Sequence, residues 1–262
     1  MRKFISLIFL FLMFILFVYN CDTDLTGVDP KESTGQLSIL LTDAPVVYDS
    51  VIITFSEISA HLDSAWVTVM HEPRRVDLLD WSNGRTLILG SADVPAGKYT
   101  QIRVKIDSAE IGVNGFVYPL DVPSGAKTGL KLGHQFTISE GATYELVMDF
   151  DVSRSIVVMG SEKNPEGYKL KPRIRVISRA ITGSISGIVL NYENIPISYA
   201  INGTDTLTSS LVDTTDGSFL LSFLPENTYR VVVIDTIDQK YEQEGVEVIT
   251  GQNNDLGSIN LQ

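Results

Sequence analysis

The sequence of 262 residues has little of the material from which most cofactor sites are built: one cysteine and three histidines. A single cysteine excludes an intrachain disulfide framework and a zinc site of four cysteines. His61, His71 and His134 leave few ligands for a histidine-rich metal centre. The sequence also lacks a Gly-x-Ser-x-Gly nucleophile motif, a His-Glu-x-x-His zinc motif and a phosphate-binding loop. We therefore predict no catalytic residue and no cofactor.

Basic residues are scarce as well. Lysine and arginine number 20 against 32 acidic residues, which gives a formal net charge of −12. A chain this acidic is a poor candidate for non-specific nucleic-acid binding. Hydrophobic residues make up 44% of the chain, enough for a packed core. At roughly 100–200 residues per domain, the length predicts one or two domains.

The amino-terminal segment has the pattern of an export signal. Arg2 and Lys3 precede the uncharged, mostly apolar run Phe4–Tyr19, which is short for a membrane-spanning helix. The only cysteine, Cys21, follows directly, and Val18-Tyr19-Asn20-Cys21 resembles the lipobox of bacterial lipoproteins. We predict a cleaved signal peptide at 1–20, lipidation of Cys21 and attachment to a membrane of the bacterial cell envelope. The alternative is an uncleaved anchor with an unmodified cysteine.

Residues 22–34 are polar and show no apolar periodicity, so 21–34 is predicted to be a flexible tether. From Gly35 onward apolar and polar residues alternate with a period of two, and long helical periods are absent. In Thr100–Asp107, for example, Ile102, Val104 and Ile106 form one face. This pattern predicts an all-β fold of two antiparallel β-sandwich domains, with short helical segments at most in Asp80–Leu89 and Ser153–Val158.

A change in charge balance places the boundary between the two predicted domains, 35–180 and 183–262. The second segment carries two basic and eleven acidic residues, a net charge of −9, and about seven short strand-like runs. Both segments contain a proline turn that ends in tyrosine: Pro95-Ala96-Gly97-Lys98-Tyr99 and Pro225-Glu226-Asn227-Thr228-Tyr229. We expect Gly97 and Asn227 to take a positive φ in these turns.

Six short stretches in the first segment, in this order, resemble a bacterial family of unknown function, the DUF4382 domain. They are Leu41-Thr42-Asp43-Ala44-Pro45, Asp77-Leu78-Leu79-Asp80 with Asn83-Gly84, Pro95–Arg103, Val122-Pro123-Ser124-Gly125, Asp149-Phe150-Asp151 with Ser155-Ile156, and Leu170-Lys171-Pro172. The resemblance covers nearly all of Gly35–Ser178. It implies an exported protein, often a lipoprotein, and brings no established chemistry.

The second segment resembles a carboxypeptidase regulatory-like domain, which is a transthyretin-like sandwich. Gly183–Val189 matches the opening strand, Thr215–Phe219 the Asp/Gly turn followed by phenylalanine, and Leu224–Val231 the proline turn before tyrosine, with Asn227 where glycine is usual. The resemblance implies a supporting or extending module without catalytic residues.

Three acidic residues are candidates for a cation site. Asp149 and Asp151 lie on one face of a predicted strand, and Asp43 joins them if its loop lies nearby. The alternative, which we prefer, is cross-strand pairing with the basic residues of the next strong strand. We take Lys169–Val176 as that strand, with Pro172 at an edge or bulge and with Lys169, Lys171, Arg173 and Arg175 on its polar face.

Four further residues are candidates for ligand contact. Trp66 and Trp81 have the ring character that stacks on sugars, and Arg103 and Lys105 can meet an anionic glycan or headgroup. The ordinary alternatives are core packing for the rings and a solvated strand face for the charges. The sequence as a whole predicts a non-catalytic binding or adhesion protein for a glycan or envelope protein. A structural subunit that contacts only protein is the alternative, and a hydrolase built from scattered residues is a third possibility.

Overall fold

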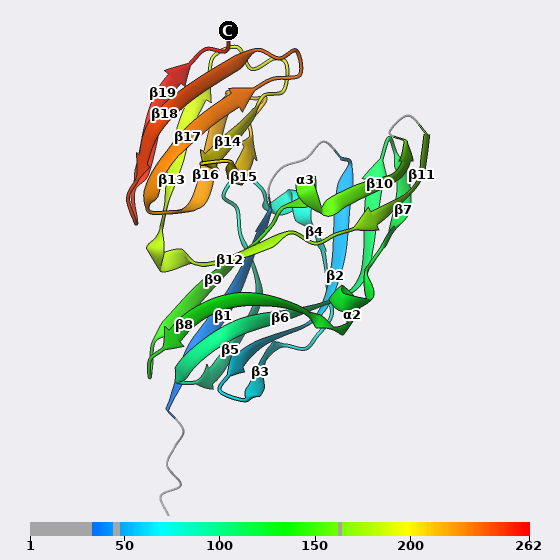
Figure 1. The fold of residues 1–262 in the computed structure, drawn as a ribbon, viewed down its shortest axis with the longest axis vertical. Helices are drawn as coiled ribbons and strands as arrows, with labels where there is room; N and C mark the ends of the chain where they lie inside the picture. The colour runs from blue at the N-terminus through cyan, green and yellow to red at the C-terminus, as the bar shows by residue number, and fades with distance from the viewer. Residues whose placement is uncertain (1–32, 44–47, 162–163) are drawn as a thin grey trace, which may run out of the picture. The chain divides into compact units, whose positions relative to one another are not determined.

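The computed structural model describes residues 33–43, 48–161 and 164–262 (Figure 1). The predicted signal peptide, Cys21 and nearly all of the predicted tether lie outside the described residues. Ser33–Gln262 forms one compact unit. Strands make up 68% of the described residues and helical turns 8%, which confirms the all-β prediction. Within the described ranges, no helix has the length and hydropathy needed to cross a membrane.

Twelve strands form the first sandwich. They are β1 (Thr34–Asp43), β2 (Ser50–Leu62), β3 (Ala65–Met70), β4 (Arg74–Asp77), β5 (Leu87–Pro95), β6 (Gly97–Val113), β7 (Phe116–Asp121), β8 (Leu130–Ile138), β9 (Thr143–Phe150), β10 (Ile156–Ser161), β11 (Asn164–Leu170) and β12 (Ile174–Ser178). One sheet has the order β12-β9-β1-β5. The other has the order β10-β11-β7-β6-β2-β3, with β4 on β2 and β8 on β6.

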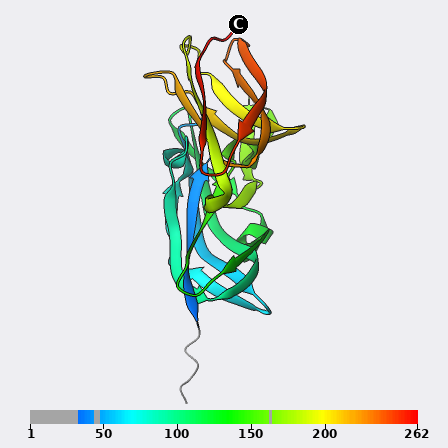
Figure 2. The same ribbon diagram turned by 90° about the vertical axis from the view of Figure 1, so that its left-hand side faces the viewer.

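Seven strands form the second sandwich, and they gather around the carboxyl terminus (Figure 2). They are β13 (Thr182–Val189), β14 (Ile197–Asn202), β15 (Asp205–Leu211), β16 (Ser218–Pro225), β17 (Asn227–Ile234), β18 (Lys240–Val248) and β19 (Asn253–Ile259). Their sheets have the orders β16-β13-β19 and β15-β14-β17-β18. Each strand overlaps one of the seven runs expected from alternation.

Each sandwich has its own hydrophobic core, and alternation explains how it is filled. In β6, Ile102, Val104 and Ile106 are buried, while Arg103 and Lys105 lie on the opposite, wetter face. Burial of each such aliphatic side chain stabilises the fold by roughly 1.5–3 kcal/mol. β6 is long enough to pair with β2 along one edge and with both β7 and β8 along the other, so it joins most of its sheet.

The pairing is mostly antiparallel, but three pairs are parallel: β1 with β9, β7 with β11, and β13 with β19. Alternation alone does not predict them. Two parallel strands need a crossover connection, and the alternation within each strand does not specify that connection. The pairing of β1 with β9 sets Thr42 beside Asp149 and Asp43 beside Phe150. It therefore brings two of the three acidic candidates to one end of the sheet.

Three local predictions need correction. Pro172 does not sit in a bulge of one strand, because β11 and β12 are separate strands in different sheets and the chain crosses between the sheets there. The expected helix at Asp80–Leu89 is a 3-10 turn, η1 (Leu78–Trp81), followed by β5. The expected helix at Ser153–Val158 is only the turn α3 (Val152–Ser155), because Ile156 already begins β10. A further short helix, α2 (Ser124–Gly129), was not expected.

Each of the two proline turns contains the same type of hydrogen bond, from the tyrosine hydroxyl back to the proline carbonyl. The Tyr99 hydroxyl donates to the Pro95 carbonyl at 2.7 Å, and the Tyr229 hydroxyl donates to the Pro225 carbonyl at 2.8 Å. Both tyrosines are buried. Gly97 has a φ of +157°, but Asn227 is not among the residues with positive φ, so that expectation was wrong. Its side-chain oxygen instead accepts from the Thr228 N–H at 2.8 Å.

The Asn83-Gly84 turn of the first sandwich meets strands β15 and β16 of the second. The Asn83 side-chain oxygen accepts from the Leu211 N–H at 3.1 Å and from the Ser210 hydroxyl at 2.9 Å. Asn83 and Gly84 have φ values of +55° and +78°. A Cβ on Gly84 would lie 2.6 Å from the Ser222 hydroxyl oxygen, so the turn fits closely against the second sandwich.

We predict that Asn83→Ala lowers the free energy of unfolding by at least about 1 kcal/mol more than Asn114→Ala, because it leaves the Leu211 N–H without its acceptor. Asn114 is a matched control, since its φ of +52° carries the same conformational preference. Urea denaturation of both variants measures the difference. Equal losses would mean that the contact with Ser210 and Leu211 contributes nothing.

Candidate functional site

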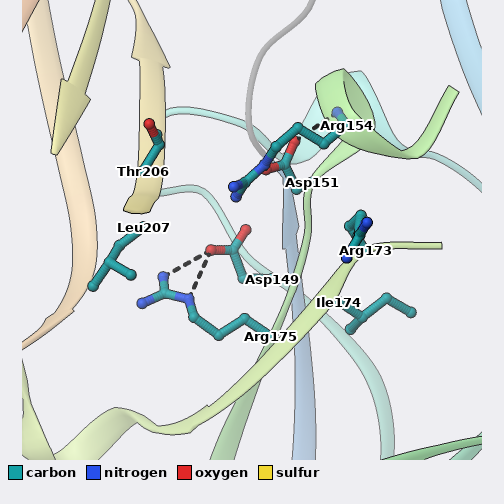
Figure 3. A pocket seen from close by; sticks show the side chains of 8 residues that line it. All are labelled: Asp149, Asp151, Arg154, Arg173, Ile174, Arg175, Thr206 and Leu207. Atoms are coloured by element: carbon teal, nitrogen blue, oxygen red, sulfur yellow. Dashed lines mark hydrogen bonds and ion pairs between the residues drawn. The ribbon is translucent and has the colours of Figure 1, made fainter. Parts of the chain in front are cut away.

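A pocket of about 550 Å³ opens where β9, β12 and β15 approach one another (Figure 3). Its walls combine carboxylates, guanidinium groups, a hydroxyl and two aliphatic side chains. The lining residues are Asp149, Asp151, Arg154, Arg173, Ile174, Arg175, Thr206 and Leu207.

Asp149 and Arg175 form the base of this pocket. They lie directly opposite each other on the antiparallel strands β9 and β12. Asp149 is only 4% exposed, and its Oδ2 accepts from Arg175 Nη2 at 2.7 Å and from Nε at 3.3 Å. The preferred cross-strand pairing of acid with base is therefore present at this position. Arg175 Nη1 is also buried, and the described part of the chain offers it no hydrogen-bond acceptor.

Burial controls the ionisation of Asp149. Loss of hydration raises the pKa of this carboxyl above its usual range, although Arg175 opposes the rise through its charge and hydrogen bond. The neighbouring Asp151 carboxylate adds to the rise, and Arg154 opposes it. Asp149 therefore keeps its proton to a higher pH than a solvated aspartate does.

The carboxylates of Asp151 and Asp43 have hydrogen-bond partners at the start of α3. Asp151 Oδ1 accepts from the Arg154 N–H at 3.0 Å and from the Ser153 hydroxyl at 2.7 Å, and Oδ2 pairs with Arg154 Nε. Asp43 Oδ1 accepts from the Val152 N–H at 3.1 Å. The structure thus brings the three cation candidates to one end of the sheet, where arginines and backbone N–H groups form hydrogen bonds or ion pairs with their carboxylates. Across the described ranges, no cluster of three or more histidine, cysteine or acidic residues is arranged to hold a metal ion.

The upper part of the pocket can accept a ligand with both polar and apolar surface. Arg173 carries an exposed guanidinium group, and none of the described acidic residues forms an ion pair with it. Three guanidinium groups against two carboxylates leave an excess of one positive charge. Thr206 adds a hydroxyl, and Ile174 and Leu207 add aliphatic surface. This mixture can hydrogen-bond to sugar hydroxyls and a carboxylate while packing against a sugar ring.

The other predicted ligand residues lie apart from this pocket. Trp66 is half-buried on β3, with the Arg103 guanidinium carbon 4.4 Å from its ring centroid and the His61 ring at 4.9 Å. Glu57 pairs with Arg103 at 3.0 Å and with Lys105 at 2.6 Å. Trp66, Arg103 and Lys105 are thus together, but Glu57 already balances part of their charge. The hydrogen bond from Lys105, together with the charges of both bases, lowers the pKa of Glu57.

Trp81 belongs to another part of the first sandwich. It ends η1, packs against the first core and lies 5.6 Å from the Arg85 guanidinium carbon. Its carbonyl accepts from the Thr42 hydroxyl at 3.0 Å. The structure therefore does not combine the two tryptophans into one sugar-stacking surface.

Sequence reasoning missed several pocket residues. Thr206 and Leu207 are more than 30 positions from Arg175, and no local pattern marks them as its neighbours. Arg154 could have been found, because Asp151 precedes the helical segment expected near Ser153 and an arginine three residues later can reach back to its carboxylate.

These features define an all-β protein of sandwich type with a mixed polar and apolar surface pocket. Residues 34–172 match the model of one family, the domain of unknown function DUF4382. The match spans more than half of the chain, so the chain belongs to this family. The family match confirms the resemblance seen in the sequence of the first segment. No curated protein matches the chain.

Solved structures show only distant similarity. The TIE protein of Bacillus anthracis is 13% identical, with a TM-score of 0.24 over 87% of this chain and 34% of that one. A leucine-rich repeat protein of Bacteroides thetaiotaomicron is 11% identical, with a TM-score of 0.21 over 88% and 26%. The major pilin subunit of Bacillus cereus is 9% identical, with a TM-score of 0.20 over 87% and 70%. The chain thus spans about a third or less of the length of the first two proteins.

We predict that the Asp149→Asn variant gains stability relative to wild type as the pH rises from about 4 to 7. A raised pKa means that the native state holds the Asp149 proton more strongly than the unfolded state, so ionisation costs wild type some of its stability. Asparagine does not ionise and is spared this cost. Urea denaturation at several pH values measures the difference.

Glu57→Gln provides a control of opposite sign. The pKa of Glu57 is lowered by Lys105 and Arg103, so its contribution to stability is present above the unfolded pKa and is lost as the pH falls. Wild type should therefore gain on Glu57→Gln as the pH rises. If wild type also gained stability relative to Asp149→Asn as the pH rises, the attraction between Arg175 and the Asp149 carboxylate would outweigh the cost of burying that charge.

Proposed function

We propose that this protein is a non-catalytic binding protein of the bacterial cell envelope, anchored by lipid at Cys21, that takes an acidic glycan in the pocket between β12 and β15. The observation that carries the proposal is the arginine-rich lining of that pocket above the buried Asp149–Arg175 pair. The absence of nucleophile and zinc motifs from the sequence supports a role without catalysis.

Hydrogen-bonding capacity favours a glycan. Arginine presents a fork of donors that suits a carboxylate, and aspartate accepts from pairs of hydroxyl groups. Ile174 and Leu207 offer surface for the C–H face of a sugar ring. The positive excess favours a sugar acid over a neutral sugar. The same chemistry can take an acidic side chain of an envelope protein, which is the second class of ligand that we consider.

We further propose that the second sandwich is a carboxypeptidase regulatory-like module that supports this site. In its Asp/Gly turn, the Asp216 carboxylate accepts from the Ser218 N–H at 2.9 Å and Gly217 has a φ of +76°. Its strand β15 contributes Thr206 and Leu207 to the pocket. The module thereby completes the binding surface as well as extending the protein.

The pocket predicts a charge-selective ligand. Arg173→Ala should weaken binding of an oligogalacturonate by at least about tenfold, because a charge-assisted hydrogen bond contributes roughly 1.5–3 kcal/mol. Isothermal titration of the purified protein measures the effect. Lys171→Ala is the matched control, since it removes the same charge two residues away and outside the pocket lining.

Three results would contradict this prediction: no heat with wild type, an equal loss in the two variants, or equal affinity for a neutral oligosaccharide. Retained binding of an acidic peptide without binding of the oligosaccharide would assign the pocket to the protein ligand instead.

The lipid anchor predicts a second, separate result. Cys21→Ser should abolish labelling by radioactive palmitate and should move the protein from the detergent phase to the aqueous phase on Triton X-114 partition, because stable anchoring requires acyl chains. Labelling of Cys21→Ser at the wild-type level would contradict lipidation at this residue.

The alternative function is that of a structural subunit contacting only protein. A specific observation favours it: several large apolar side chains are exposed together on β7 and β10. Surface patches of this kind commonly mark contacts with other proteins.

A further inference from the structure

Strand β10 ends the eight-stranded sheet, and among the described strands only β11 pairs with it (Figure 1). A strand in this position presents unpaired N–H and C=O groups that can accept another strand. The Lys171 N–H donates to the Ser155 carbonyl at 2.7 Å, which fixes the direction of the backbone groups. By antiparallel alternation, Val157 and Met159 direct their backbone groups toward β11, whereas Val158 directs its N–H and C=O toward the open edge, as Ile156 does its carbonyl. The Ile156 N–H instead closes α3 by donating to the Val152 carbonyl.

Edge strands usually carry charge or proline that discourages such pairing. The other terminal strands of the first sandwich follow this rule with Arg74 on β4, Asp93 on β5, Lys131 on β8 and Arg175 on β12. β3 is uncharged but lies against β5, where a Cβ on Gly90 would be 2.8 Å from the Met70 Cβ. β10 reads Ile-Val-Val-Met-Gly-Ser and has neither charge nor proline.

On the solvent side of this edge, exposed apolar side chains surround Lys169, which lies opposite Val157 and pairs with Asp121 of β7. Val157 and Met159 are 40% and 39% exposed, and Val117 on β7 is 66% exposed. The strand registers place these three residues on the same outer face, opposite the buried Tyr168 and Leu120. An exposed apolar face beside an unprotected edge favours the addition of a strand that is itself apolar.

We propose that β10 pairs with β10 of a second copy of this chain, antiparallel and centred on Val157. In this register Ile156 of each copy lies opposite Val158 of the other, and Val157 lies opposite Val157 of the second copy. All three pairs are aliphatic, and no like charges meet although the chain has a net charge of −12. The Val158 N–H of each copy then donates to the Ile156 carbonyl of the other, which gives about two hydrogen bonds across the twofold axis.

Cysteine cross-linking tests this register in full-length protein held in native membranes. Val157 should form a non-hydrogen-bonded pair with its counterpart, with Cα atoms about 4.5 Å apart, within reach of a disulfide. Val157→Cys should raise the oxidised dimer on non-reducing gels at least about fivefold over wild type, whose one cysteine sets the baseline.

Two controls define the failure of the proposal. Ile237→Cys introduces a thiol on the second sandwich at a position more exposed than Val157, and Met159→Cys places one opposite Ser155 of the second copy. Both should stay near the wild-type baseline. The pairing is overturned if Val157→Cys stays at that baseline, or if either control forms as much dimer as Val157→Cys. The result is independent of the glycan pocket, because β10 contributes no residue to its lining.

Discussion

Burial of one face of β6 and β2 is the constraint on which the first sandwich depends. Their inward side chains are aliphatic or aromatic throughout, including Phe55, Ile58, Val104 and Ile106. A slip of one residue in their register would exchange these for charged neighbours such as Arg103 and Lys105. β6 also pairs with β7 and β8, and β2 pairs with β3. The same constraint therefore sets the position of β7, β11 and β10 on one side of the sheet and of β3, which carries Trp66, on the other.

Much of this fold can be read from alternation, and the reason is physical. In a strand with one solvent-exposed face, every second residue is apolar and buried. This alternation predicts β8, β9 and all seven strands of the second sandwich from the sequence. The cross-strand pairing of Asp149 with Arg175 follows from the same reasoning, because opposite charges on adjacent antiparallel strands attract. The turn residues were more ambiguous, as the negative φ of Asn227 illustrates.

The remaining features depend on contacts between residues that are distant in sequence. The crossing of the chain between sheets at Pro172 separates β11 from β12, yet both keep the alternation of a single strand. The pocket needs Thr206 and Leu207 from β15, and the turn that holds β15 in place, Asn83-Gly84, lies more than 120 residues earlier. No local pattern encodes such proximity. The separation of Trp81 from Trp66 has the same origin.

The most direct test of the account is hydrogen–deuterium exchange of the intact protein with and without an oligogalacturonate. The account predicts slower exchange in the segments that line the pocket, Asp149–Arg154, Arg173–Arg175 and Thr206–Leu207, and unchanged exchange in β3. Protection confined to β3 and β6 around Trp66 and Arg103, or protection nowhere, would contradict it.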